Sequence, residues 1–489
     1  MVVAGLDFGT QSVKVLVYDS EKKEVLSLVS HPFDLISKDD GSREQIASWY
    51  IDGLIDCFDN IDKEIKERIE ALSVSGQQHG FVPLGKDGEV LSPVKLWCDT
   101  STSAECDELT VLYGSKEELI KNVGNPILPG YTASKILYFK KHHPELFKKL
   151  EYVLLPHDYI NYYLTGKVVM ERGDASGTAL FNIYENKWDE KLASLIDKDL
   201  IAKLPPVTDS KCAVGFVKDD VRAILGLREN VIVASGGGDN MMSAIGTGTV
   251  NDGALTMSLG TSGTLFAYSE KPIIDPECRL AGFASSTGGY LPLLCTMNCT
   301  VASENMRALF SLGVKEFDSL ASTSPIGAEG LILLPFFNGE RVPNYPKGEA
   351  VLAGMNMTNV KDANVARAAL EGVSYEFLLG LEAFAESGFK AKSLSLTGGG
   401  SKSPFWRQMI ADITGLEVKV PLVKEAAAFG AALQALSLAE GKSISEIAEE
   451  HIGFDKEREA HPDCSAKEKY DKAYKKWKSY SDNLGGLFS

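Results

Sequence analysis

The 489-residue sequence lacks the features that mark secreted, disulfide-rich or membrane-spanning proteins. Its eight cysteines include no CxxC pair, and Cys295 and Cys299, the nearest two, are followed by no second Cys or His pair. Neither a disulfide framework nor a zinc site is therefore expected. No apolar run reaches the roughly 18 residues that cross a membrane, and the opening MVVAGLDFGT has no basic region of a secretory signal. We therefore expect a cytoplasmic protein with reduced thiols and no membrane partner.

Positive charge is also scarce in this chain. Lys and Arg number 50 against 67 Asp and Glu, which gives a formal net charge of −17. This argues against general affinity for nucleic acid, which needs a basic patch. A small anionic ligand is not excluded, because nearby backbone donors outweigh a distant negative field. The length favours two or more domains.

The usual phosphate-binding signatures are missing. GKS at 441–443 has no upstream glycine at the spacing of a P-loop, and no complete GxGxxG occurs. A bound nucleotide would therefore be held differently than in P-loop or Rossmann proteins.

What the sequence does contain is a repeated strand, Gly-Thr turn, strand pattern. VVAGLDFG and VKVLVYD flank the first turn, and GALTMSLGTSGTLFAYSEK repeats the pattern about half the chain later. Gly9-Thr10 matches Gly260-Thr261. Such turns are common by chance, but their placement at the start of each half predicts two similar α/β domains facing one another. The boundary is expected near residues 246–252.

Further elements follow from periodicity and turn residues. The expected elements are a long helix over 45–69, a strand over 70–76, a hairpin turn between 81–84 and 90–97, a buried strand over 231–234 and a surface helix over 465–482.

Three glycine-rich turns are candidates for ligand contacts. Successive N–H groups in the two Gly-Thr turns would form a nest for phosphate oxygens, with Thr10 and Thr261 adding hydroxyl donors. The third turn, in SLTGGGSKSPFWRQ, lies between a strand and a helix, and Gly398–Gly400 would let a flat ring lie against the backbone. A tight strand-to-helix crossover explains this third turn equally well.

Two lone carboxylates follow buried strands. Asp239 comes directly after Gly236–Gly238, where an aspartate is either a helix N-cap or a proton acceptor for a hydroxyl nucleophile. Local sequence favours the cap. Asp7 ends the first strand, and a buried charge is costly unless it is paired or bound to metal. Lys14 is either a phosphate contact or an ordinary solvated strand lysine.

The motifs, taken in order, resemble the FGGY carbohydrate kinases, most closely those that act on xylulose. The matching segments are GLDFGTQSVKVLVYD, SGQQHG, LWCDTSTSAEC, GYTASKILYFKKH, LLPHDYINYYLTG, GDASGT, SGGGDN, SLGTSG, LLPFFNGERVP, AVLAGMNMTNVKDANVARAALEGVSYEF and LTGGGSKSPFWRQMIADITG. They run from about residue 3 to about residue 440. One departure is Tyr138, where the pattern usually has tryptophan.

The resemblance implies two actin-like (ribonuclease H-like) α/β domains with an interdomain cleft. Residues 1–248 would bind the sugar and residues 249–489 would bind ATP. The implied reaction is ATP-dependent, Mg²⁺-requiring phosphorylation of D-xylulose at C5, with Asp239 as general base and Asp7 near the metal through water. The implied sugar contacts are Gln78, His79, Trp97, Asp99, Asp239 and Asn240. The implied ATP contacts are Thr10, Gln11, Lys14, Gly260, Thr261, Gly399, Gly400 and Ser403.

Alternatives remain open at this point. Another pentulose or a polyol would suit the shared motifs, and a non-catalytic actin-like sugar sensor is a rival from another class. Retention of both Asp7 and Asp239 argues against the sensor. His79 and Trp97 are also compatible with purely structural roles. The sequence assigns no direct role to Glu340 and Arg341, and it leaves the oligomeric state open, a homodimer included.

Overall fold

The first sheet is built on the hairpin that contains the first Gly-Thr turn. In the computed structural model, which describes residues 1–488, β1 (Val2–Phe8) pairs antiparallel with β2 (Ser12–Asp19) and parallel with β6 (Ile69–Gly76). The sheet order is β14-β15-β6-β1-β2-β3, with β16 beside the end of β6. The remaining strands are β3 (Glu24–Pro32), β14 (Ala213–Phe216), β15 (Ile232–Ala234) and β16 (Gly237–Gly238).

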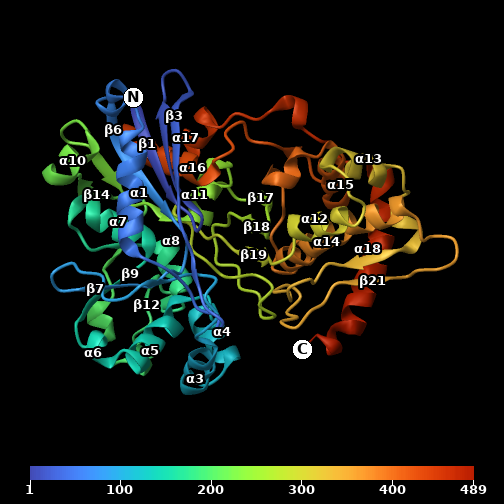
Figure 1. Cartoon of the computed structure of the whole chain (residues 1–489), viewed down its shortest axis with the longest axis horizontal. Helices are drawn as coiled ribbons and strands as arrows, with labels where there is room; N and C mark the ends of the chain where they lie inside the picture. The colour runs from blue at the N-terminus through green and yellow to red at the C-terminus, as the bar shows by residue number, and fades with distance from the viewer. Residues whose placement is uncertain (489) are drawn as a thin grey trace.

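The second sheet repeats this plan. β17 (Ala254–Leu259) pairs antiparallel with β18 (Gly263–Ala267) and parallel with β22 (Ser393–Thr397). β19 (Leu293–Thr296) and β23 (Val418–Lys419) complete the order β19-β18-β17-β22-β23. The two sheets lie in separate lobes (Figure 1). The predicted mixed α/β fold with two related halves is thus confirmed.

Helices cover both sheets. Those of the first lobe are α1 (Ala47–Asp59), α2 (Lys63–Lys66), α3 (Ser103–Tyr113), α4 (Lys116–Val123), α5 (Thr132–His142), α6 (Pro144–Phe147), α7 (Pro156–Thr165), α8 (Arg172–Ala175), α9 (Glu190–Ile196), α10 (Asp219–Leu225) and α11 (Asp239–Gly246). Those that follow β17 are α12 (Thr300–Ala308), α13 (Val314–Ser322), α14 (Asp362–Glu386), α15 (Pro404–Thr414), α16 (Ala426–Glu440), α17 (Ile444–His451) and α18 (Cys464–Leu484).

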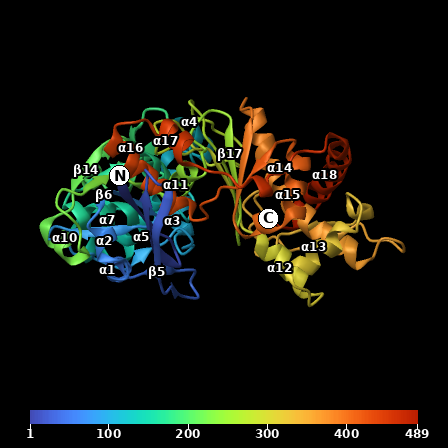
Figure 2. The same ribbon diagram turned by 90° about the horizontal axis from the view of Figure 1, so that it is seen from above.

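Helix α16 returns from the second half of the chain to the first lobe. It packs on β1, β6 and α11, and both views place it there with α17 beside it (Figure 2). The crossing with α11 is very close, because a Cβ on Gly430 would lie 1.8 Å from the Met242 carbonyl oxygen, so only glycine fits. The first lobe therefore includes residues far beyond the predicted boundary at 248. The assignment of whole halves to sugar and ATP stays a prediction.

Two predicted elements differ in detail. The helix expected over 45–69 is divided into α1 and α2, and the Asn60 side chain donates to the Asp56 carbonyl oxygen at the break (2.8 Å). The surface helix expected over 465–482 is α18, but one of its faces buries Tyr470, Tyr474 and Trp477 against the second core. Its extent was correctly predicted, whereas its buried aromatic stripe was not considered.

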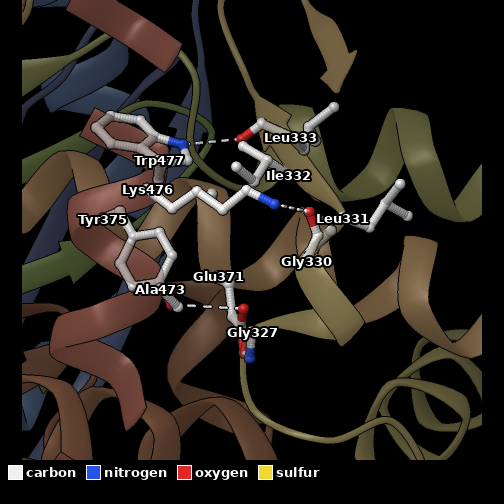
Figure 3. A pocket seen from close by; sticks show the side chains of 12 residues that line it. Gly327, Gly330, Leu331, Ile332, Leu333, Glu371, Tyr375, Ala473, Lys476 and Trp477 are labelled. Atoms are coloured by element: carbon white, nitrogen blue, oxygen red, sulfur yellow. Dashed lines mark hydrogen bonds between the residues drawn. The ribbon is translucent and has the colours of Figure 1, made fainter. Parts of the chain in front are cut away.

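A small cavity of about 20 Å³ lies beneath α18 (Figure 3). It is lined by α14, α18 and β20 (Ile332–Leu334), and Lys476 and Trp477 of its lining donate to the carbonyl oxygens of Gly330 (2.8 Å) and Leu333 (2.9 Å). A space of this size holds about one water molecule. It is a packing detail and not a substrate site.

No helix among residues 1–488 is long and apolar enough to cross a membrane. All eight cysteines are free thiols, as predicted.

Candidate active site

The predicted catalytic and sugar-contacting segments meet at one edge of the first sheet. The parallel register pairs Phe8 of β1 with Gly76 of β6, and Gly76 with Gly238 of β16. The residues that follow these three strands therefore leave the sheet side by side. They include Thr10, Gln78, His79 and Asp239, and open α/β sheets bind ligands at this edge.

Asp239 is the first residue of α11 and not its N-cap. Gly238 occupies the cap position, and no side chain caps the helix. Asp239 Oδ1 accepts hydrogen bonds from Asn240 N (2.8 Å) and Nδ2 (3.1 Å). Burial raises the pKa of Asp239 to about 7, with the negative charges of Asp7 and Asp174 adding to the effect. A carboxyl group with a pKa near neutrality suits proton transfer at physiological pH.

Asp7 lies on β1, and β6 separates it from β16, the strand that precedes Asp239. Its Oδ1 accepts from the Ser75 hydroxyl (2.7 Å), and burial raises its pKa despite that bond and the opposing charge of Lys14. Lys14 lies opposite Asp7 on β2, but its Nζ contacts Glu425 Oε2 at 2.5 Å. Glu425, which directly precedes α16, was missed by sequence reasoning because nothing local connects it with β1.

The donor set at this edge fits Mg²⁺. Burial raises the pKa of Asp239, and the negative charge of Asp7 raises it further, so a bound cation would favour the ionised carboxylates. Carboxylate oxygens are the ligands that Mg²⁺ prefers, together with water and phosphate.

Buried polar atoms without partners surround the predicted sugar contacts. Gln78 Oε1 accepts from Asn240 Nδ2 (2.9 Å), whereas Gln78 Nε2 and His79 Nδ1 find no hydrogen-bond partner within residues 1–488. Burial lowers the pKa of His79 well below its usual value, and the charges of Lys135 and Arg341 lower it further. The imidazole is therefore neutral at pH 7, with one donor and one acceptor nitrogen. Unpaired buried polar groups of this kind match a polyhydroxylated ligand.

Trp97 and Thr10 are joined by a hydrogen bond. The Trp97 indole Nε1 donates to Thr10 Oγ1 (2.9 Å), and that hydroxyl in turn donates to Gln77 Oε1 (3.0 Å). The Thr10 hydroxyl proton is thus already donated to Gln77. A phosphate at this turn would therefore be bound by the backbone N–H and not by the hydroxyl of Thr10. Gln11, next in the turn, is exposed.

Asp99, a predicted sugar contact, is held by four protein donors. Its Oδ2 accepts from Arg43 N (2.9 Å) and Lys95 Nζ (3.0 Å), and its Oδ1 accepts from Ser101 N (3.0 Å) and Oγ (2.6 Å). These four donors saturate a fully buried carboxylate. Asp99 therefore stabilises the turn that carries Trp97, and its contact with the sugar stays a prediction.

The predicted ATP contacts gather at the matching edge of the second sheet. Ser258 of β17 pairs with Thr397 of β22, which puts the turn at Gly260-Thr261 beside the turn at Gly398–Gly400. Gly398 has φ +81°, and a Cβ there would lie 2.5 Å from the Leu259 carbonyl, so this position requires glycine.

The predicted ATP contacts Gly399, Gly400 and Ser403 differ in how closely other protein atoms pack against them. A Cβ on Gly399 would meet nothing within 4 Å, so its backbone is accessible to a ring. A Cβ on Gly400 would press on Leu259 and Trp406, which indicates a packing role. Ser403 caps α15 by accepting from Trp406 N (2.9 Å), and its contact with ATP stays a prediction.

Two side chains of the second half reach the first-half site. Phe283 lies against the His79 ring, with centroids 5.6 Å apart, and the Arg341 guanidinium lies over the Trp97 ring at 5.7 Å. Glu340 is buried and accepts from Met297 N (2.7 Å), which fixes the segment that precedes α12. The NGERVP motif, which contains Glu340 and Arg341, is typical of the family. Nothing in the sequence predicts that it contacts the LWCD motif, which contains Trp97.

Comparison with known proteins covers almost the whole chain. The N-terminal domain of the FGGY family of carbohydrate kinases matches residues 2–246, and the C-terminal domain of the same family matches residues 255–439.

Relatives and solved structures agree with these matches. A xylulose kinase of Haemophilus influenzae is 38% identical over 489 residues, covering 98% of this chain and 99% of that protein. The crystal structure of a xyloylose kinase from Brucella ovis superposes with a TM-score of 0.93 at 28% identity, over 100% of both chains. That of xylulose kinase from Bifidobacterium adolescentis gives 0.83 at 30% identity, over 98% of this chain and 99% of that one.

Proposed function

This chain belongs to the FGGY family of carbohydrate kinases, and we propose that it phosphorylates D-xylulose at the C5 hydroxyl with ATP. The observation that carries the proposal is the place of Asp239. It stands at the sheet edge beside unpaired polar atoms of Gln78 and His79, with its pKa raised to about 7. Full-length similarity to proteins named xylulose kinases supports the choice of sugar.

The proposed reaction is an in-line phosphoryl transfer. The C5 oxygen of xylulose bonds to the γ-phosphorus of ATP as the bond between that phosphorus and the β,γ-bridging oxygen breaks. The hydroxyl proton passes to the Asp239 carboxylate, and ADP leaves with the bridging oxygen. Asn240 holds Asp239 Oδ1 through two hydrogen bonds, so Oδ2 stays available for the sugar hydroxyl.

The rest of the site binds and orients the two substrates. Gln78 Nε2 and the His79 imidazole would hydrogen-bond the C2 carbonyl and neighbouring hydroxyls, and Trp97 would form a wall. The turns at Gly260 and Gly399 would receive the nucleotide. Asp7 would hold Mg²⁺ through water, with Asp239 nearby. When bound, the metal would neutralise phosphate charge.

A coupled ADP-release assay tests this proposal directly. Xylulose should give the highest kcat/KM among ribulose, gluconate, xylitol, ribitol and glycerol. Preference for another pentulose or a polyol would keep the kinase and replace its substrate. No sugar-dependent ADP release with any of them would favour the sensor instead.

A further inference from the structure

His79 has a left-handed backbone conformation. Its φ is +65°, in a region that only a few per cent of residues other than glycine adopt, histidine more often than most. Such a conformation persists only where the surroundings hold it in place, and it is concentrated at functional sites. The question is therefore what holds His79.

The holding groups come from the first turn of α5. The His79 carbonyl oxygen accepts from Lys135 Nζ at 2.7 Å and from Thr132 Oγ1 at 3.1 Å. Lys135 Nζ also donates to the Gly130 carbonyl oxygen (2.8 Å). Both lone pairs of the His79 carbonyl are thus occupied by side chains of one short segment, residues 130–135.

Burying the Lys135 amine to make these hydrogen bonds has a large desolvation cost. It is completely buried, and no carboxylate within residues 1–488 forms an ion pair with it. Asp99, the nearest acid to influence it, is saturated by other donors. Burial lowers the pKa of Lys135 to about 7, and an amine buried without an ion pair destabilises a fold. Its presence therefore points to a functional requirement at His79.

The same segment also fixes the imidazole. The Tyr131 ring lies 4.8 Å from the His79 ring, centroid to centroid, and Phe283 lies on it at 5.6 Å. Gly177 is so close that a Cβ there would fall 2.4 Å from His79 Nδ1 and Cε1. The ring has little room to turn, so its orientation follows from the backbone that Lys135 and Thr132 hold.

We propose that Lys135 and Thr132 are positioning residues for sugar recognition, which hold the left-handed turn at His79 so that its imidazole meets the ketose. This inference rests on the proposed function of His79 as a sugar contact. It gives a physical role to the GYTASK segment, which the sequence connects with the family but not with any chemistry.

The first test removes the donor and keeps the side-chain length. Lys135→Met should lower kcat/KM for xylulose by about 10- to 100-fold, because small misplacements of orienting groups carry costs of this size. KM for ATP should change less than about threefold, because the nucleotide is not expected to touch this turn and its orienting groups are not displaced. Thr132→Val should act in the same direction and Thr132→Ser should restore activity. Lys141→Met, on the outer side of the same helix, is the matched control.

A double-mutant cycle with His79→Ala separates positioning from general stability. If Lys135 acts through His79, Lys135→Met should cost little further kcat/KM for xylulose once the imidazole is absent. Equal losses in both backgrounds would overturn the inference. An unchanged kcat/KM for xylulose in His79→Ala alone would instead overturn the proposed sugar contact, so the two failures are distinguishable.

The His79 resonance gives a readout that folding alone would not move. Since Lys135 lowers the pKa of His79, Lys135→Met should raise that pKa in an NMR titration, with the signal assigned by its loss in His79→Ala. If Lys135→Met does not fold, Thr132→Val carries the same cycle, with its melting temperature measured alongside. A folded Thr132→Val with wild-type kcat/KM for xylulose and an unmoved His79 signal would overturn the inference.

Discussion

The guanidinium of Arg341 lies over the indole ring of Trp97, 5.7 Å from its centroid, and so joins the two halves of the chain. Trp97 in turn donates to Thr10 Oγ1 (2.9 Å) in the first Gly-Thr turn. A partly exposed cation–π contact contributes about 0.5–1 kcal/mol. This is enough to bias the relative position of the lobes without locking it.

Arg341→Gln should therefore impair closure of the lobes on their substrates. We expect a higher KM for xylulose and more ATP hydrolysis per xylulose phosphorylated, because water reaches the phosphate when closure is incomplete. Small-angle scattering with xylulose and a non-hydrolysable ATP analogue should show a compact wild type and a less compact variant. Arg228→Gln, which changes the same charge far from the site, is the control. Identical profiles for wild type with and without ligands would contradict closure itself.

Asp239→Asn should lower turnover by ~10²–10⁴-fold, because the proton acceptor is lost while size and local hydrogen bonding are largely kept. Steady-state kinetics should show KM for ATP nearly unchanged. A variant with near wild-type kcat would mean that Asp239 is not the general base.

The pH profile should report the same carboxyl group. Since the basic form of Asp239 is the active one and its pKa is raised to about 7 without a bound cation, kcat/KM for xylulose should fall at acidic pH, with a midpoint at or below 7 because Mg²⁺ favours the carboxylate form. Asp174→Asn removes a negative charge that raises this pKa, so the profile should move to lower pH. A profile that is flat from pH 5 to 8 would argue against a titrating base.

The stability of the folded protein should fall as pH rises, whereas its activity should increase. The folded-state pKa of Asp239 lies above its ordinary value of 3.8, so the folded protein binds the extra proton, and stability falls as pH rises from about 4 through 7. Asp239→Asn should therefore raise the melting temperature at pH 8 and change it little at pH 4. Scanning calorimetry at both pH values measures this. An equal change at both would mean that the ionised carboxylate is not destabilising.

Two glycine substitutions should separate packing from nucleotide contact. Gly430→Ala puts a methyl group 1.8 Å from the Met242 carbonyl, so it should lower the free energy of unfolding by at least ~1–3 kcal/mol. Gly399→Ala meets no protein atom within 4 Å and should leave the melting temperature unchanged while raising KM for ATP. If Gly399→Ala leaves KM for ATP unaltered, the nucleotide does not lie against that turn.

Much of the fold was accessible from local sequence. The two strand, Gly-Thr turn, strand patterns predicted two related sheets, because alternation and turn residues act over a few neighbours. The same local logic placed Asp239 after a glycine turn at the end of a strand. Local sequence also favoured an N-cap at Asp239, which the structure contradicts because Gly238 holds that position.

The contacts that define the site were decided by the tertiary structure alone. The approach of Arg341 to Trp97, of Lys135 to His79 and of Glu425 to Lys14 joins segments far apart in the chain. The saturation of Asp99 likewise depends on Arg43 from another strand.

The physical reason is the range over which each kind of information acts. Backbone propensity and side-chain period are properties of neighbouring residues, so the sequence by itself determined the sheets, the glycine turns and the residue types at their ends. The contacts between side chains of the two lobes depend on how helices such as α16 return to a distant sheet. Many chain arrangements have similar local propensity, and close packing of the core selects one of them. The sequence thus supplied the reacting groups, and only the folded chain decided which of them remain free to meet a substrate.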